Sequence, residues 1–134
     1  MSSYSFLDKK QIRFHSQRAK KLRQEDKYTV KSVDFLLRWA EKEMIERLKD
    51  IRKEIRSCAL LSLDASEDFL RTLEERKTKY DIFPDLSLSD EETFSLPDNH
   101  YDAIISFFEL HKINDLPGWL IQIRRTLKED GFFM

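Results

Sequence analysis

Histidine and cysteine, which often serve as metal ligands and catalytic groups, are few in this sequence. The three histidines are His15, His100 and His111, and the one cysteine is Cys58. Two of these histidines and one carboxylate would make the ligand set of a non-haem iron site. Their separations match no local metal-binding motif, and the sequence has no phosphate-binding loop, paired-cysteine zinc spacing or nucleophile elbow. We therefore predict no metal site and no catalytic residue, and expect Cys58 to be a small core residue.

Length and composition limit what these residues can belong to. A chain of 134 residues with 40% hydrophobic content is enough for one packed domain, and two glycines with three prolines predict long helices. No apolar run is long enough to span a bilayer, and the amino terminus has no apolar signal segment. A lone cysteine favours a reducing compartment. We interpret the serine-rich, basic start of the sequence as a structural arm and not as a transit peptide, and therefore expect a bacterial cytoplasmic location in preference to the mitochondrial matrix.

The net charge of −1 hides two halves of opposite sign. Residues 1–56 hold 16 Lys and Arg against 9 Asp and Glu, whereas residues 57–134 hold 8 against 16. The basic half could bind nucleic acid or an anionic membrane. Charged helix faces are more often solvated or packed on the acidic body of the same chain. We therefore predict that the basic helices are solvated or packed in this way, and that the chain has no nucleic-acid partner.

The elements that position these groups alternate between helix and strand. We predict a weakly packed helix over residues 8–24, then a longer one capped by Thr29 or Ser32. The longer helix carries a stripe of apolar residues from Val33 to Ile55, with Glu41 on the opposite, charged face. That stripe fits packing against a sheet better than a coiled coil. Residues 1–56 are expected to form a helical cap.

The following residues predict a parallel sheet. We expect a strand at 57–63, a helix at 67–76 started by Asp64 and Ser66, and a strand near either 80–83 or 86–89. A buried strand follows at 102–107. Asn114 or Asp115 then caps a helix that runs to about residue 127, and an Asp-Gly turn leads into a last strand at 132–133. Residues 57–134 therefore predict an α/β domain.

Three parts of the sequence resemble a known family. The stretch LHKINDLP, residues 110–117, matches six of eight positions of a family signature, and QIRRTLKEDGFF continues it. Together with the opening FLDKKQIRFHSQRA and the helix end RLKDIRKEI, this sequence is similar to class I S-adenosylmethionine-dependent methyltransferases. The branch is that of the complex I assembly factor implicated in arginine hydroxylation and of the biotin-pathway methyltransferase. The resemblance implies a Rossmann-like sheet, truncated because the sequence stops inside the strand at Met134.

The cofactor implied by this resemblance is S-adenosylmethionine, and the sequence departs from the family where that cofactor binds. An acid and three glycines are expected after the first strand, because a glycine turn lets the backbone approach the methionine moiety. The aligned residues are Leu61, Leu63, Ala65 and Glu67. Side chains at the glycine positions would also resist a positive φ, by roughly 1–2 kcal/mol each. We predict a degenerate cofactor site.

Four residues remain as cofactor-binding candidates, all by resemblance. Asp90 and Glu91 fit the family's acidic pattern, with Asp90 as the adenine contact. Asp81 is the candidate for the ribose hydroxyls if it ends the second strand. It stands too close to Asp90 for a complete helix and strand between them, so one strand-helix unit is missing. If Asp81 instead lies on the third strand, the second strand is the one that is missing. His111 lies in the signature and could face the pocket or pack its loop.

Three functional hypotheses follow. The chain could be a working methyltransferase or hydroxylase, a non-catalytic relative that binds a protein partner or assembly client, or a truncated gene remnant. The loss of several cofactor determinants together favours the second and third hypotheses. An uncovered sheet edge would in addition promote self-association into a homo-oligomer.

Overall fold

The computed structural model describes residues 7–25, 35–62, 65–84 and 92–134. Within these ranges the elements are, in chain order, helix α1 (Lys9–Glu25), helix α3 (Phe35–Asp50), strand β1 (Ser57–Leu61), helix α4 (Glu67–Glu75), strand β2 (Lys79–Ile82), strand β3 (Tyr101–Ser106), the 3-10 turn η2 (Leu110–Lys112), helix α5 (Leu116–Thr126) and strand β4 (Leu127–Phe133). The predicted caps at Thr29 and Ser32 and the candidate strand at 86–89 lie outside the described residues.

The strands form one parallel sheet in the order β2-β1-β3-β4. β1 and β3 are its two inner strands, and Cys58 of β1 lies opposite Tyr80 of β2 on one side and Ala103 of β3 on the other. The predicted α/β class with a parallel sheet is confirmed. Of the two candidate strands after α4, the one near residues 80–83 is present as β2, and it pairs directly with β1.

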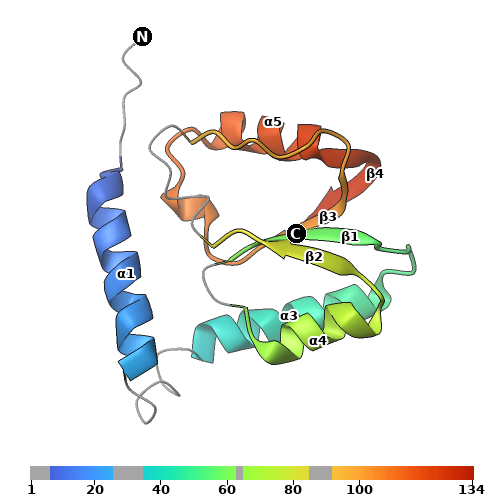
Figure 1. Cartoon of the computed structure of the whole chain (residues 1–134), viewed down its shortest axis with the longest axis horizontal. Helices are drawn as coiled ribbons and strands as arrows, with labels where there is room; N and C mark the ends of the chain where they lie inside the picture. Colours follow the sequence, from blue (N-terminus) through green and yellow to red (C-terminus); the bar gives the residue numbers. More distant parts are fainter. Residues whose placement is uncertain (1–6, 26–34, 63–64, 85–91) are drawn as a thin grey trace.

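Helices cover both faces of the sheet, with α3 and α4 on one face and α5 on the other (Figure 1). Alternate residues of β1 serve the two layers, as the period of a strand requires. Cys58 and Leu60 pack toward α3 and α4, while Ala59 and Leu61 pack toward α5. This double burial explains why β1 is apolar at every position after Ser57.

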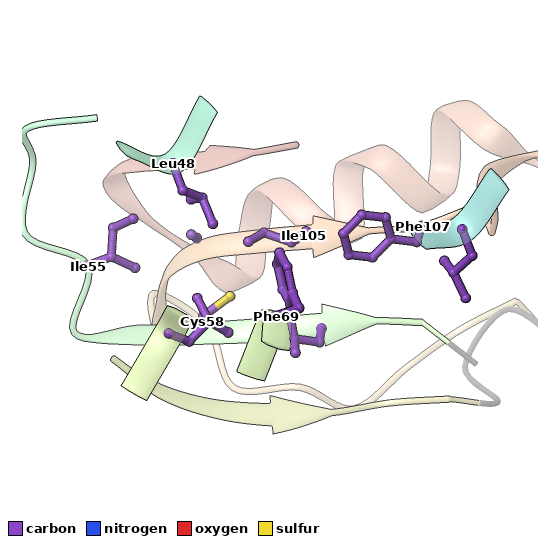
Figure 2. Packing of buried hydrophobic residues seen from close by; sticks show 10 residues of the cluster. Leu48, Ile55, Cys58, Phe69, Ile105 and Phe107 are labelled. Atoms are coloured by element: carbon purple, nitrogen blue, oxygen red, sulfur yellow. The ribbon is translucent and has the colours of Figure 1, made fainter. Parts of the chain in front are cut away.

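The α3/α4 layer is built around aromatic and aliphatic side chains (Figure 2). Phe69 of α4 meets Phe107 edge to face, with ring centroids 5.2 Å apart. Leu37 and Leu48 bring α3 into the same cluster as Leu60 of β1. The apolar stripe of α3 therefore packs against the sheet, as predicted, and not in a coiled coil.

The predicted length of α3 is wrong by one turn, because the helix ends at Asp50 and not near Ile55. The guanidinium of Arg76 explains where the chain leaves the helix. It donates to the carbonyl of Leu48 at 2.7 Å and to that of Ile51 at 3.0 Å, so groups at the helix end are bonded across to α4. Ile55 is nevertheless buried in the core.

The helix starts near the sheet agree with the sequence, and the predicted strand at 132–133 is present, but it belongs to a strand that begins earlier. The Ser66 hydroxyl caps α4 by accepting from Phe69 N–H, and Asp115 caps α5 by accepting from Gly118 N–H. The predicted Asp-Gly turn is wrong, because β4 already begins at Leu127 and contains both residues at an irregularity in its pairing with β3. Asn99 N–H and His100 N–H donate to the carbonyls of Arg125 and Thr126, so the residues at the end of α5 are already bonded to the segment before β3 and lead directly into β4.

Candidate functional site

Ligands of open parallel α/β sheets bind at the carboxyl ends of the strands, where the strand order reverses direction. Here the chain moves from β1 outward to β2 and then returns to β3 on the other side of β1, so the reversal lies between β1 and β3. The backbone stays joined beyond the strands, since Phe107 N–H donates to the Leu61 carbonyl at 3.1 Å. Ser62, the next residue, is fully buried. The backbone is therefore hydrogen-bonded and buried just beyond the ends of β1 and β3.

Glu41 of α3 lies at the amino terminus of α4, next to the same reversal point. Its Oε1 accepts from Ser66 N–H at 2.9 Å, and its Oε2 accepts from the Arg38 guanidinium at 2.6 Å. The side chain is only 2% exposed. The prediction that Glu41 belongs to the solvated face of α3 is therefore wrong. A free backbone N–H at a helix start offers a carboxylate a hydrogen bond and a favourable dipole, which outweighs the preference for water.

The positions aligned with the family's acid (Leu61) and with two of its glycines (Ala65 and Glu67) lie at the end of β1 and around the start of α4. Leu61 is buried under α5, Ala65 is half-buried, and Glu67 lies exposed in the first turn of α4. Leu63 lies outside the described residues.

Asp81 is the second-last residue of β2 and hydrogen-bonds within the sheet. Its carboxylate accepts from the Tyr101 hydroxyl at 2.8 Å, reaching across β1 to β3. Burial and this hydrogen bond raise the pKa of Tyr101. Asp81 is otherwise exposed, and its role as a ribose contact stays a prediction.

The acidic segment before β3 contributes a residue that the sequence did not single out. Both oxygens of Glu92 are engaged, with Asn114 N–H at 2.5 Å, Asp115 N–H at 2.8 Å and the Lys9 ammonium at 2.7 Å. Burial opposes its ionisation, but these donors together outweigh burial and hold the pKa of Glu92 below its ordinary value. Glu92 thus fixes the signature loop. Asp90 and Glu91 lie outside the described residues, and their cofactor contacts stay predictions.

A related carboxylate holds the opposite end of the sheet. Asp102, at the start of β3, accepts from the backbone N–H groups of Arg56 and Ser57 and lies 3.3 Å from the Lys128 ammonium. Burial raises the pKa of Asp102, but the hydrogen bonds from Ser57, Arg56 and Lys128 have the larger combined effect and hold this pKa below its ordinary value. Asp102 therefore has a structural role, because it ties the start of β3 to the start of β1.

The histidines are scattered. His111 is exposed on η2, while His15 and His100 are exposed against Phe14 and Tyr101. In the ranges described above, no group of three His, Cys, Asp or Glu side chains is placed to hold a metal ion. Cys58 is fully buried, as predicted, and burial raises the pKa of its thiol to about 12.

A groove opens beside the reversal point, between α3 and the carboxyl end of β3. It encloses about 190 Å³ and is lined by Trp39, Ala40, Glu43, Met44, Arg47, Ser106, Phe107 and Phe108. Trp39 is 58% exposed and Phe108 is 45% exposed. Phe108 adopts a φ of 55°, which is uncommon for a bulky residue and is frequent at functional sites. The Ser106 hydroxyl is buried and has no hydrogen-bond partner in the described part of the chain.

Comparison with known families agrees with this architecture. A family model described as "Methyltransferase domain" matches residues 45–134, more than half of the chain. The chain therefore belongs to the methyltransferase domain family.

Within that family, the similar curated relatives are mitochondrial. "Arginine-hydroxylase NDUFAF5, mitochondrial" of Danio rerio is 43% identical over 63 residues, covering 47% of this chain and 19% of the relative. The proteins of the same name from Rattus norvegicus and Homo sapiens are 47% and 45% identical over 47 residues, covering 35% of this chain and 14% of each relative. The chain thus spans about a fifth or less of the length of these relatives.

A solved structure shows similarity at low identity. A SAM-dependent methyltransferase from Thermotoga maritima, described as a possible histamine N-methyltransferase, is 16% identical with a TM-score of 0.45. The match covers 76% of this chain and 54% of that chain. In the described residues, no helix is long and apolar enough to cross a membrane.

Proposed function

We propose that this chain is a partner-binding methyltransferase-fold protein of the complex I assembly factor type, which holds a protein client without transferring a methyl group. The groove between α3 and β3 carries this proposal. Large apolar side chains at its rim are left in solvent, where their exposure is unfavourable unless another surface covers them.

The composition of the groove supports a protein as the occupant. Aromatic residues, methionine and arginine are enriched in protein interfaces, and Trp39, Met44, Arg47 and Phe108 are of these types. A volume of about 190 Å³ is smaller than the roughly 300–1,000 Å³ of small-molecule pockets, but it suits one apolar anchor side chain.

Native-gel separation of extracts from source cells tests this function. Tagged wild-type chain is expected to migrate with complex I assembly intermediates, and Trp39→Ala is expected to lose at least tenfold of that signal. Ile121→Ala is the matched control, because Ile121 is 62% exposed on α5, on the opposite face of the sheet. The proposal is contradicted if wild type and Trp39→Ala associate equally with the intermediates. It is also contradicted if the wild-type chain migrates as a free protein, without any assembly intermediate.

A working S-adenosylmethionine-dependent methyltransferase or hydroxylase is the second candidate, favoured by membership of the family. In it Asp81, Asp90, Glu91 and His111 would contact the cofactor. Calorimetric titration with S-adenosylmethionine and S-adenosylhomocysteine separates the two candidates. Saturable binding at micromolar concentration would favour the enzyme, and no heat at millimolar ligand would favour the partner-binding protein.

Two further proposals accompany the first. Within the described residues β4 pairs only with β3, so its outer edge is open to a second copy, and light scattering after gel filtration tests for a homo-oligomer. For location we propose a reducing compartment, the bacterial cytoplasm in preference to the mitochondrial matrix of the named relatives. Cell fractionation tests this location.

A further inference from the structure

We propose that Glu41 is a built-in carboxylate ligand of the α4 amino terminus, which keeps carboxylate-bearing molecules such as S-adenosylmethionine out of the reversal point of the sheet. This goes beyond the partner-binding function, because it names the side chain that closes the site.

The position of the carboxylate argues against a solvated surface residue. Glu41 is 2% exposed, although it comes from a helix whose other acidic residues, such as Glu43 and Glu46, are exposed. Withdrawing a carboxylate from water is costly unless its oxygens are satisfied. Both are satisfied here, by Ser66 N–H at 2.9 Å and by Arg38 at 2.6 Å.

The partner of Glu41 is the group that an external anion would use. In parallel α/β folds, the helix that follows a strand at the reversal point presents backbone N–H groups to anionic ligands. That helix is α4, and Ser66 is its first capping residue. The Ser66 hydroxyl accepts a hydrogen bond from Phe69 N–H, and the Ser66 N–H donates one to Glu41. Both capping groups of this residue are therefore already engaged.

A cofactor carboxylate does not fit beside this arrangement. It would have to displace Glu41 and break the Arg38 pair, or lie next to a like charge in a buried environment, which is strongly unfavourable. Glu67 and Asp68 in the first turn of α4 add further negative charge. Glu41 therefore acts as a specificity-determining residue against anions at this position.

Chemical rescue distinguishes a ligand-like carboxylate from a general packing role. Glu41→Ala removes the carboxylate and leaves a gap at Ser66 N–H, which a small carboxylate can enter. We expect its melting temperature to be lower than that of the wild type and to rise by several degrees in formate. Chloride at equal ionic strength should have no such effect.

Two control variants sharpen the test. Glu41→Gln fills the gap with an uncharged group, and Glu46→Ala removes an exposed acid from the same helix, so neither should respond to formate. A folded Glu41→Ala that shows no selective response to formate overturns the proposal. So does saturable binding of S-adenosylhomocysteine to the wild-type chain, a measurement that remains decisive if Glu41→Ala does not fold.

Discussion

The Lys9 ammonium lies 2.7 Å from Glu92 Oε1, and both side chains are less than a tenth exposed. This ion pair joins the start of α1 to the segment that leads into β3. The same ammonium also donates to the Lys112 carbonyl, and Leu7 N–H donates to the Asn114 side chain at 2.7 Å. The amino-terminal helix is thus attached to the family signature by polar contacts at its first turn.

Lys9→Met should lower the free energy of unfolding strongly, although Lys9 lies among charged residues that the sequence alone would place on the surface. The substitution leaves the Glu92 carboxylate buried without its cation, and breaking a buried pair from one side costs roughly 3–5 kcal/mol. Urea unfolding measures the free energy of unfolding. Lys10→Met, at an exposed neighbouring position, should change it by less than about 0.5 kcal/mol. Equal effects of the two variants would contradict a buried pair.

The ionised state of Glu92 predicts a loss of stability in acid. Its pKa in the folded chain lies below the ordinary value of 4.5, so its contribution is fully present above about pH 4.5 and is lost as the pH falls through the lowered pKa. Asp102 behaves in the same direction. Glu92→Gln should therefore be less stable than wild type at pH 7, with a smaller difference at pH 3, in guanidinium unfolding. An unchanged difference would show that the Glu92 charge is not the cause, and Glu129→Gln, at an exposed site, is the control.

The Cys58 thiol should be unreactive in the folded chain. Burial raises its pKa to about 12, so almost no thiolate is present at pH 8, and the sulfur is fully buried in the sheet. A thiol-specific chromogenic reagent is expected to label native protein only at the rate of unfolding, and to label it at once in denaturant. Immediate labelling of native protein would contradict the buried position.

Phe69→Ala should destabilise the α3/α4 layer strongly. The ring is fully buried and packs edge to face on Phe107, and removal of such a side chain costs roughly 3–5 kcal/mol. Thermal and urea unfolding measure the loss. Phe14→Ala tests the same change at a ring that is 58% exposed, and its effect should be small. A small effect at both positions would mean that the layer is loosely packed.

The parallel sheet could be predicted because its two inner strands, β1 and β3, are buried on both faces and therefore contain uninterrupted apolar runs, with residues such as Ala59 and Ile104. The caps at Ser66 and Asp115 were also predictable, since capping depends on a few adjacent residues. The end of α3 was not, because the side chain that bonds to it, Arg76, comes from the residue that follows α4. Local periodicity contains no information about such distant donors.

The candidate site was harder to predict for the same reason. Glu41 shares its spacing with exposed acids, and only the approach of Ser66, 25 positions away, makes it a buried ligand. Glu92 was visible as part of an acidic run, but its partner Lys9 is far away in the sequence. The groove at Trp39 and Phe108 depends on how α3 meets β3, which no motif specifies. Sequence thus indicated the family, whereas the chemistry depends on long-range contacts.

The central position of β3 has a consequence for how the chain folds. Tyr101 and Ile104 belong to the α5 layer, while Ala103 and Ile105 belong to the α3/α4 layer, so one strand completes both. Its pairing with β1 joins Cys58 to Ala103, positions distant in the sequence. Because β3 contributes to both layers, neither layer is complete until β3 has left the ribosome, and β1 lacks this neighbour until then. Non-local parallel pairing of this kind also forms slowly. We therefore expect the two layers to acquire hydrogen-exchange protection together, in a single late step.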